Sequence, residues 1–422
     1  MDSLATTYPA PGTPTAMHVR TRWIQLGLGL ICMMAISSPQ YVWALFTKPL
    51  GAELAAGAAD IQWTFSLLIV LQTFFSPAQG YLIDSIGPRL LIAAGMVLTA
   101  ASWVVASGVT TLTGLYLSYG LMGGLGTGVV YVGVVGLMVR WFPDRRGFAA
   151  GVVAAGYGMG AIITSIPVAN SIASVGYRPT LMYFGLAFGI VGIAAAVFLR
   201  RPPAASILPP SLGTARDVTP GVMLRTPLFW LMFVMMTMMS TTGLMVTSQI
   251  GAIAGDFKVA GAMVFGMVAL PLALTFDRFT NGLTRPFFGW VSDRIGRENT
   301  MCLAFGLEGV AMALWLFSLG DPLLFVLLSG VVFFGWGEIF SLFPSTLTDS
   351  FGTRHATTNY GFLYMAQGIG AIFGGPLASM LHASAGSWTP VFAVAIAADL
   401  LTAVLAIAAL KPLRRAWMAR AA

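Results

Sequence analysis

Two arginines, Arg278 and Arg285, lie in a stretch of the sequence that is otherwise apolar enough to cross a membrane, from Ala260 to Val291. A charged side chain at the centre of a bilayer costs roughly 2.5 to 3.5 kcal/mol on insertion scales, so it is kept where it faces a water-filled cavity, a partner or a passing ion. A guanidinium group also binds a carboxylate through two parallel hydrogen bonds. We therefore expect a pathway for an anion, with Arg285 in direct contact with the substrate.

The neighbours of Arg285 support a binding face on one helix. Asp277, Asn281 and Arg285 follow one another at intervals of four residues and share a broad helical face, and Arg278 lies near the same face. We expect Asn281 to take part in substrate binding. The alternative is an internal ion pair between Arg285 and either Asp277 or Glu338, without any ligand.

Carboxyl groups within the apolar stretches are candidates for coupling transport to protons. Burial raises the pKa of a carboxyl group and an adjacent arginine lowers it, so only a group balanced between the two effects can carry protons usefully. We take Glu338 as the first coupling candidate and Asp277, with its neighbour Arg278, as the second. Glu308 and Asp399 have no visible partner in the sequence, and we expect them to form interfacial or inter-helix hydrogen bonds.

The composition is that of a membrane protein, with 57% hydrophobic and 9% charged residues, against about 25% charged residues in a soluble domain. A membrane-spanning helix needs about 20 apolar residues, and such stretches recur along the whole chain. They predict an all-α membrane protein with twelve transmembrane helices, at residues 23–46, 61–83, 90–107, 112–139, 147–171, 178–199, 227–254, 260–291, 300–318, 323–348, 358–382 and 388–410.

The basic residues predict how the chain is oriented, because lysine and arginine accumulate in cytoplasmic loops. Seventeen of the 22 fall on one side of the predicted spans, together with both termini. Both termini are therefore expected in the cytoplasm. The net charge of +7 then reflects topology and attraction to anionic lipid, and no nucleic-acid partner is expected.

Other classes of protein find little support in the residues. Cys32 and Cys302 lie within spans and the three histidines are scattered, so we expect no disulfide, metal site or cofactor. Gly124–Gly128 lies inside an apolar span with no strand before it, so it favours close helix packing over nucleotide binding. No cluster of a nucleophile or paired acids indicates an enzyme. A sensor would usually carry an added soluble domain, and the loops here are short.

The chain repeats itself at half its length. Gly80-Tyr-Leu-Ile-Asp84-Ser-Ile-Gly-Pro-Arg89 returns as Gly289-Trp-Val-Ser-Asp293-Arg294-Ile-Gly-Arg297, and the segment leading to Gly160 has an echo in the segment leading to Gly370. This predicts two pseudo-symmetric six-helix bundles with a substrate site between them near the midplane. The expected organisation is a tail at 1–22, bundles at 23–199 and 227–410, a cytoplasmic linker at 200–226 and a tail at 411–422.

These two loops resemble the G-x-x-x-D-x-x-G-x-R/K motif that follows spans two and eight in the major facilitator superfamily. The resemblance implies two rocking bundles and alternating access. Each aspartate can cap a neighbouring helix, while the arginines pair with acids and lock one state. We expect a conformational gating role for Asp84, Arg89, Asp293, Arg294 and Arg297.

Most of the chain is similar to the oxalate/formate antiporters and their monocarboxylate-transporter relatives. Trp141-Phe142-Pro-Asp-Arg145-Arg146-Gly-Phe-Ala-Ala-Gly151 resembles the signature that enters span five of the monocarboxylate transporters. Asn281-Gly-Leu-Thr-Arg285-Pro-Phe resembles the segment with the substrate-binding arginine in both groups, and Asn359-Tyr-Gly-Phe resembles the antiporter. Span one lacks the Asp-Gly-rich motif of eukaryotic monocarboxylate transporters, which favours the bacterial antiporter branch. The resemblance also implies a protein of the plasma membrane that works as a monomer.

Gln367 departs from the antiporter pattern. The family has a second essential cation, a lysine, at the matching place in span eleven, and here the side chain is a neutral amide. A dianion such as oxalate would face Arg285 plus whatever Arg278 contributes, whereas a monocarboxylate needs one cation. The sequence thus favours formate, lactate or pyruvate as substrate.

Aromatic and amide side chains match the cage that surrounds the substrate in the antiporter family. Hydroxyl groups can hydrogen-bond a small carboxylate, and aromatic rings exclude water around it; each residue could equally serve helix packing. The resemblance implies substrate contact for Gln40, Tyr41, Tyr131, Tyr157, Trp336, Tyr364 and Phe340, the last in place of a family tyrosine.

Together the residues and the resemblance predict a secondary transporter of small carboxylates that works by alternating access. Anion exchange needs only a site that cannot reorient when empty, whereas proton symport needs a titrating carboxyl group coupled to Arg285. The antiporter resemblance favours exchange, and Asp277 and Glu338 keep proton-coupled symport as the alternative.

Overall fold

The structure, a computed structural model, describes residues 16–203 and 217–421 of the chain, and nearly all of its regular structure is helical. The elements of the N-terminal half are α1 (Ala16–Ala35), α2 (Ser38–Tyr41), α3 (Trp43–Glu53), α4 (Ala58–Phe74), α5 (Ser76–Ile86), α6 (Pro88–Ala106), α7 (Leu112–Leu115), the π-helical segment Tyr116–Met122, α8 (Gly123–Trp141), α9 (Arg146–Val175) and α10 (Tyr177–Val197).

The C-terminal half contains one short hairpin besides its helices. Its elements are α11 (Pro220–Met223), α12 (Pro227–Asp256), β1 (Met263–Val264), β2 (Met267–Val268), α13 (Ala269–Ile295), α14 (Arg297–Ser318), α15 (Pro322–Trp336), α16 (Ile339–Phe351), α17 (Ala356–Ile372), the π-helical segment Phe373–Leu377, α18 (Ala378–Ala385), α19 (Thr389–Leu405), the π-helical segment Ala406–Leu410 and α20 (Lys411–Ala421).

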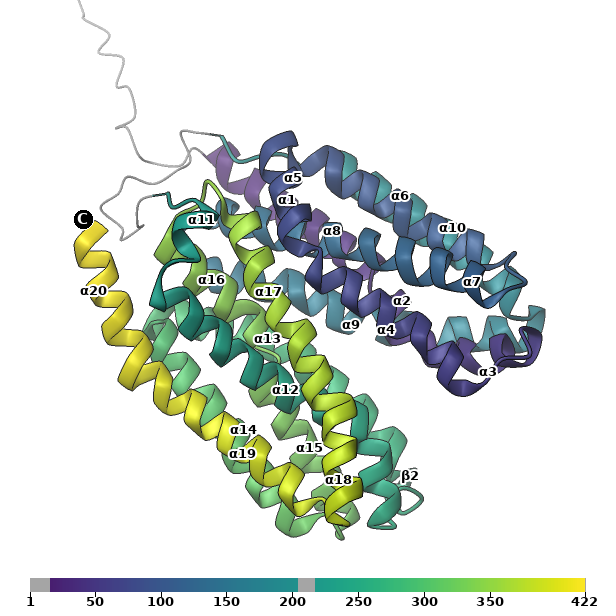
Figure 1. The fold of residues 1–422 in the computed structure, drawn as a ribbon. Coiled ribbons are helices and arrows are strands. Elements are labelled where there is room, and N and C mark those ends of the chain that lie inside the picture. Colours follow the sequence, from purple (N-terminus) through teal and green to yellow (C-terminus); the bar gives the residue numbers. More distant parts are fainter. Residues whose placement is uncertain (1–15, 204–216, 422) are drawn as a thin grey trace, which may run out of the picture.

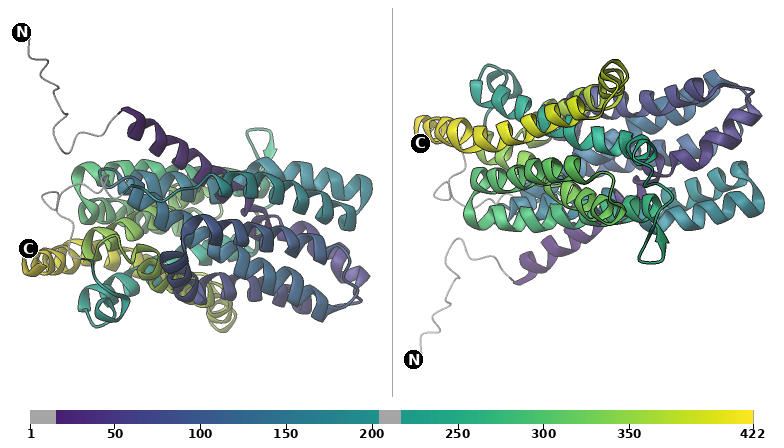
Figure 2. Two further views of the ribbon diagram at one scale, coloured as in Figure 1. Left: turned by 90° about the horizontal axis from the view of Figure 1, so that it is seen from above. Right: turned by 90° about the horizontal axis from the view of Figure 1, so that it is seen from below.

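The helices form two bundles, one from each half of the chain (Figure 1). The bundles lie close together at the end that carries α5, α11 and α16, and diverge toward the end that carries α3, α18 and β2. We call these the basic end and the opposite end, because the arginines that follow α5, α8 and α13 lie at the first. In the views from above and below, most helices of both halves run in roughly the same direction (Figure 2).

The helices are long and apolar enough for a membrane protein. Eight of those described could cross a membrane by length and composition, or ten if each of two bent helix pairs is one span. The other two expected spans are α13, which carries charged residues along its length, and the run from α17 to α18, which a π-helical segment interrupts. These account for the twelve predicted spans.

The outer surface fits a lipid environment. Large apolar side chains point away from both bundles, with Phe317 88% and Ile190 70% exposed. Contiguous apolar surface of this kind is avoided on soluble monomers but is required where hydrocarbon is the solvent. The buried polar side chains, by contrast, gather inside the bundles and between them.

The prediction of one helix from residue 260 to 291 is wrong at its start. Residues 263–268 form an antiparallel hairpin, in which Met263 pairs with Val268, and the helix begins only at Ala269. The turn uses Phe265 and Gly266, both with positive φ, a conformation that glycine adopts without a steric penalty. The apolar composition of the hairpin concealed it, although the glycine was a signal.

The first two spans are bent rather than straight. The helix pair that ends with α3 bends by 43° after Tyr41, and the pair α4–α5 bends by 49° after Phe74. Pro77 lies in the first turn of α5, just after the second break, where its missing N–H is tolerated but cannot continue the preceding helix. Pro39 lies in the first turn of α2, just before the first break.

Both predicted tails are partly helical. α1 begins at Ala16, inside the expected tail, and α20 continues the last span as far as Ala421. The linker contains the short helix α11. Residues 1–15 and 204–216 of the predicted tail and linker lie outside the described residues.

Two equivalent glycines let the bundles touch at the backbone. A Cβ at Gly151 of α9 would collide with the Arg285 carbonyl group of α13, and a Cβ at Gly361 of α17 would collide with the Ser76 carbonyl group of α5. Each of these carbonyls precedes a proline. The sequence repeat thus corresponds to two equivalent helix crossings between the bundles, and one of them carries Arg285.

Candidate anion-binding site

Arg285 is buried between the two bundles, with 1% of its surface exposed. One terminal nitrogen of its guanidinium group donates to the Ala154 carbonyl oxygen of α9 (2.6 Å) and the other donates to Oδ1 of Asn281 (2.7 Å). The guanidinium carbon lies 4.5 Å from the centroid of the Phe340 ring, a distance at which a cation is attracted to the ring face. The Nε atom has no hydrogen-bond partner.

Arg285 forms no ion pair with any carboxylate in the described part of the chain. Asp277 instead accepts a hydrogen bond from the Ser329 hydroxyl (2.9 Å). Neither carboxylate oxygen of Glu338 has a hydrogen-bond partner. The internal ion pair that the sequence left open is therefore absent among the described residues, and the groups that accept hydrogen bonds from the guanidinium are neutral.

Tyr131 of α8 is the centre of an aromatic cluster beside Arg285. Its ring stacks on Tyr364 of α17, with centroids 4.8 Å apart, and meets the edge of Tyr157 of α9 at 5.1 Å. It also contacts Phe340, the ring beneath the guanidinium group, at 6.3 Å. The cluster therefore draws side chains from both bundles to one place.

Amide side chains join the tyrosine hydroxyls of this cluster. The Tyr157 hydroxyl donates to Gln40. Nε2 of Gln72 donates to the hydroxyls of Tyr157 (3.1 Å) and Tyr364 (3.4 Å). Gln72 was not among the predicted site residues, although an amide within an apolar span was a signal. Tyr41 extends the cluster, with its ring 5.5 Å from that of Tyr157.

The remaining predicted site residues lie at the edge of this arrangement. Trp336 contacts Phe340, with ring centroids 5.9 Å apart. Gln367 is 8% exposed and its Oε1 atom has no partner. No hydrogen bond between Gln367 and Arg285 is present among the described side chains. Tyr360, another residue the sequence did not single out, packs against Tyr364 at 5.7 Å.

The four carboxyl groups of the spans separate into two environments. Asp277 lies on α13, whereas Glu308, Glu338 and Asp399 are fully buried in the C-terminal bundle, within electrostatic reach of one another. Close packing of Glu308 on Gly335, and of Gly309 on Asp399, brings these helices together. Within the described residues these side chains do not form a group that could hold a metal ion.

At the basic end each bundle caps a helix of the other. Asp293 accepts hydrogen bonds from the backbone nitrogens of Gly147 (3.1 Å) and Phe148 (2.9 Å) at the start of α9. Asp84 accepts from the backbone nitrogen (2.9 Å) and hydroxyl (2.7 Å) of Thr358 near the start of α17. A carboxylate at a helix N-terminus satisfies free N–H groups and the helix dipole, so both caps stabilise contact between the bundles.

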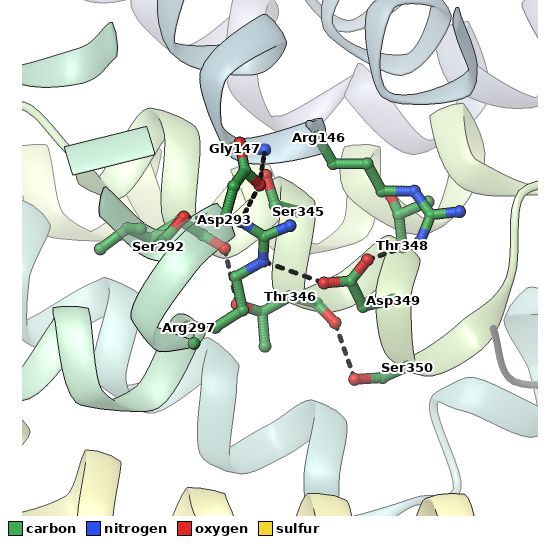
Figure 3. A network of polar contacts seen from close by, with 12 residues as sticks. Arg146, Gly147, Ser292, Asp293, Arg297, Ser345, Thr346, Thr348, Asp349 and Ser350 are labelled. Atoms are coloured by element: carbon green, nitrogen blue, oxygen red, sulfur yellow. Dashed lines mark hydrogen bonds and ion pairs between the residues drawn. The ribbon is translucent and has the colours of Figure 1, made fainter. Parts of the chain in front are cut away.

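An ion-pair network reinforces this contact (Figure 3). Asp349 of α16 pairs with Arg146 of α9 (2.5 Å), with Arg297 of α14 (2.9 Å) and with Arg414 of α20 (3.6 Å). Arg297 also pairs with Asp293 (2.6 Å). We call the network of Arg146, Asp293, Arg297 and Asp349 the latch. It joins the two bundles through partly desolvated charges.

The contacts at the basic end differ from the predicted gating contacts at Arg89 and at Arg294. Asp84 pairs with Arg140, which also donates to the Arg354 carbonyl oxygen (3.2 Å), rather than with Arg89. Arg89 is exposed and forms no ion pair with the described residues. Arg294 lies over the Trp290 ring, 3.9 Å from its centroid, instead of pairing with an acid.

Three charged residues of this end escaped prediction: Arg140, Arg146 and Asp349. Arg146 stands in the motif that enters span five, which was a signal. Asp349 lies near the end of span ten without a recognisable motif, and its partner Arg146 is 203 residues away in the sequence.

Comparison with known proteins identifies relatives along nearly the whole chain. The sequence matches the Major Facilitator Superfamily over residues 26–280 and 250–420. It is 34% identical to an oxalate:formate antiporter of Oxalobacter formigenes, over 94% of this chain and 93% of that protein. It is 27% identical to the uncharacterized MFS-type transporter YhjX of Escherichia coli (84% and 87%) and 27% identical to monocarboxylate transporter 13 of Bos taurus (80% and 77%).

The latch yields a first prediction, for the variant Asp349→Asn. Removing one partner of a buried ion pair costs about 3–5 kcal/mol because the remaining charges stay desolvated. The part of this cost that comes from the lost pair with Arg146 falls only on the state in which the basic end is closed, because Arg297 and Arg414 belong to the same bundle as Asp349. We therefore expect the bundles to separate at the basic end. Spin labels at Ser85→Cys and Arg415→Cys, in a chain whose native cysteines are replaced by serine, should report longer distances.

The matched control is Glu298→Gln, which removes the pair between Glu298 and Arg414 (2.8 Å) within the C-terminal bundle and leaves the latch intact. Its distance distribution should equal that of the parent chain. Equal distributions for all three proteins would contradict a role of Asp349 in holding the basic end closed.

Proposed function

The chain belongs to the major facilitator superfamily, and we propose that it moves small carboxylate anions across the membrane by alternating access. It is a multi-pass membrane transporter and not an enzyme. The observation that carries the proposal is the buried guanidinium of Arg285, which lies between the bundles without a carboxylate partner in the described part of the chain.

A small carboxylate fits the chemistry of this site. The Nε atom of Arg285 has no hydrogen-bond partner, and its two terminal nitrogens donate to neutral oxygens of Ala154 and Asn281. A charged acceptor can replace a neutral one with a shorter and stronger hydrogen bond. The tyrosines and glutamines around Tyr131 supply further hydroxyl and amide groups, while Phe340 and Trp336 keep water away. The names of the relatives agree with this substrate class, as oxalate:formate antiporter and monocarboxylate transporter.

We infer that monocarboxylates such as formate, lactate or pyruvate are the preferred substrates. Arg285 is the cation at the centre of the aromatic cluster, beside Phe340 and Tyr131, whereas Arg278 contacts only Tyr41 at its edge. Gln367, where the antiporter resemblance implies a lysine, is neutral. A monoanion is balanced by Arg285 alone, whereas a dianion would leave one negative charge without a partner in a desolvated site.

The same geometry accounts for alternating access. The basic end, which we place in the cytoplasm with both termini, is closed by the latch and the two helix caps. Opening it requires α9 to move away from α13, and this movement breaks the bond between Arg285 and Ala154. An anion that satisfies Arg285 would stabilise the crossing between states, because an uncompensated charge makes that crossing costly. We therefore favour obligatory exchange of anions, by a monomer in the plasma membrane.

Proton-coupled symport of a monocarboxylate is the alternative, and Glu338 is the observation that supports it. Glu338 is fully buried within electrostatic reach of Arg285, and its carboxylate oxygens are unpartnered. The adjacent Gly337 packs on Asn281, which binds Arg285. Asp277 is the weaker candidate for proton coupling because its carboxylate already accepts a hydrogen bond from the Ser329 hydroxyl.

The main test is substitution of Arg285. Losing a buried, hydrogen-bonded charge partner costs about 2–5 kcal/mol in binding, so Arg285→Ala should abolish carboxylate uptake into proteoliposomes. Arg285→Lys keeps the charge but loses the planar set of donors, so uptake should fall at least tenfold. Both variants should reach the membrane in normal amounts, and near-normal uptake by Arg285→Ala would refute the proposal.

Selectivity depends on Gln367. In a competition assay with labelled formate, unlabelled formate, lactate and pyruvate should compete better than oxalate against the unmodified protein. Gln367→Lys adds a second cation and should shift the preference toward oxalate. Gln249→Lys is the matched control, since Gln249 of α12 is equally buried and its amide donates to the Gly375 carbonyl oxygen in the π-helical segment Phe373–Leu377. A preference for oxalate in the unmodified protein would contradict this inference.

Uptake into vesicles that contain no internal anion distinguishes anion exchange from proton symport. An exchanger should not accumulate labelled carboxylate there under an inward proton gradient, but should do so rapidly once the vesicles are loaded with unlabelled substrate. Strong accumulation in the empty vesicles, lost in both Glu338→Gln and Asp277→Asn, would replace exchange with proton symport.

A further inference from the structure

Arg278, the second arginine within a span, lies in a different environment from Arg285. Its guanidinium carbon is 5.5 Å from the centroid of the Tyr41 ring, so the contact joins α13 to α2 of the other bundle. One terminal nitrogen, NH1, is buried and has no hydrogen-bond partner. The neighbouring Asp277 is held by Ser329, and Arg278 forms no ion pair with the described carboxylates. Among the described residues this positive charge therefore has no ion-pair partner, and Asp277 is the carboxyl group within electrostatic reach of it.

Arg278 lies on the route between the opposite end and Arg285. It is seven residues nearer the start of α13, which corresponds to a rise of about 10 Å along the helix. Met159 of α9 packs on Gly282, midway between the two arginines. No hydrogen bond or ring contact among the described residues joins the bundles farther toward the opposite end. An anion that enters from there meets Arg278 first.

The aromatic cluster connects the two arginines. Tyr41, beneath Arg278, contacts Tyr157, and Tyr157 contacts Tyr131 beside Phe340 and Arg285. A ring face holds a guanidinium group by its flat side and leaves the N–H edge available to an anion. The two guanidinium groups face different partners, Ala154 and Asn281 for Arg285 and the Tyr41 ring for Arg278, so each would bind an anion separately and the two would act in series.

We propose that Arg278 and Tyr41 form an outer binding site for carboxylate monoanions, which captures the substrate and passes it to Arg285. The inference rests on the proposed transport of carboxylates and adds a second site to it. Capture by a single positive charge depends on long-range attraction, which salt weakens. The outer site therefore governs how efficiently low concentrations of substrate are taken up, while Arg285 governs translocation.

Kinetics separate the two roles. With formate as the probe, Arg278→Gln should raise the KM for uptake about tenfold, leave the maximal rate within twofold and reduce the dependence of uptake on ionic strength. Arg278→Lys should restore most of the loss, since capture needs charge rather than a planar set of donors. Lys48→Gln, which removes an exposed charge near the same end, should change neither parameter. An unchanged KM, or a lower maximal rate with an unchanged KM, would overturn the proposal.

A labelling experiment tests the outer site without relying on transport. Phenylglyoxal modifies accessible arginines, and peptide mass spectrometry can follow its reaction with Arg278 in the purified protein. Formate should protect Arg278 in the unmodified protein and also in Arg285→Ala. Loss of protection in Arg285→Ala, or no protection in either protein, would refute an independent outer site. If protection is found but no carboxylate is transported, the proposed function fails and the anion site stands.

Discussion

The structure depends on one constraint: the positive charge of Arg285 is held away from water and forms no ion pair with a carboxylate in the part of the chain that the structure describes. A charge in a medium of low dielectric is tolerated only with well-placed acceptors, and these come from both bundles, as the Ala154 carbonyl from one and Asn281 with the face of the Phe340 ring from the other. The guanidinium therefore links the bundles by contacts that a moving helix must break. An ion pair within one bundle would have balanced the charge of Arg285. The guanidinium would then not need acceptors from both bundles, and movement of the bundles would not affect its balance.

The two bundles share their closing machinery but not their chemistry. Gly151 and Gly361 form equivalent backbone crossings, and Asp293 and Asp84 cap equivalent helices. At the crossing, however, Arg285 of one bundle corresponds to Ser76 of the other. The two halves are therefore symmetric at the contacts that close the basic end and asymmetric at the proposed binding residue. Because a ligand shifts an equilibrium only through its different affinity for two states, the proposed binding at Arg285 would place the control of movement on α13.

The sequence could predict what is encoded locally or repeated. The spans, the two bundles and the capping aspartates follow from apolar length, the half-length repeat and a short motif. The same reasoning missed the pair between Arg146 and Asp349, because neither sequence distance nor composition connects two residues on separate helices. It also found no partner for Glu308 and Asp399, since only the packing of Glu308 on Gly335 and of Asp399 on Gly309 brings the two acids within electrostatic reach of each other. The hairpin before α13 was mistaken for helix because apolar residues in a membrane protein suit both.

The distribution of charge within the C-terminal bundle follows from the same constraint. Glu308 and Asp399 lie on α14 and α19, helices that pack against each other and against α12 and α15 of their own bundle, whereas Arg278 and Arg285 lie on the helix that meets the other bundle. A carboxylate on that face would compete with the substrate for the guanidinium groups and repel an approaching anion. Separation of Glu308 and Asp399 from the cations keeps these two negative charges off the face between the bundles. Asp277 and Glu338 are the exceptions: Asp277 lies beside Arg278 on α13 and accepts a hydrogen bond from Ser329, and Glu338 lies at the junction of α15 and α16, within electrostatic reach of Arg285 and Asp399. Among the described carboxyl groups, the position of Glu338 would make its protonation felt at Arg285 as well as inside the bundle.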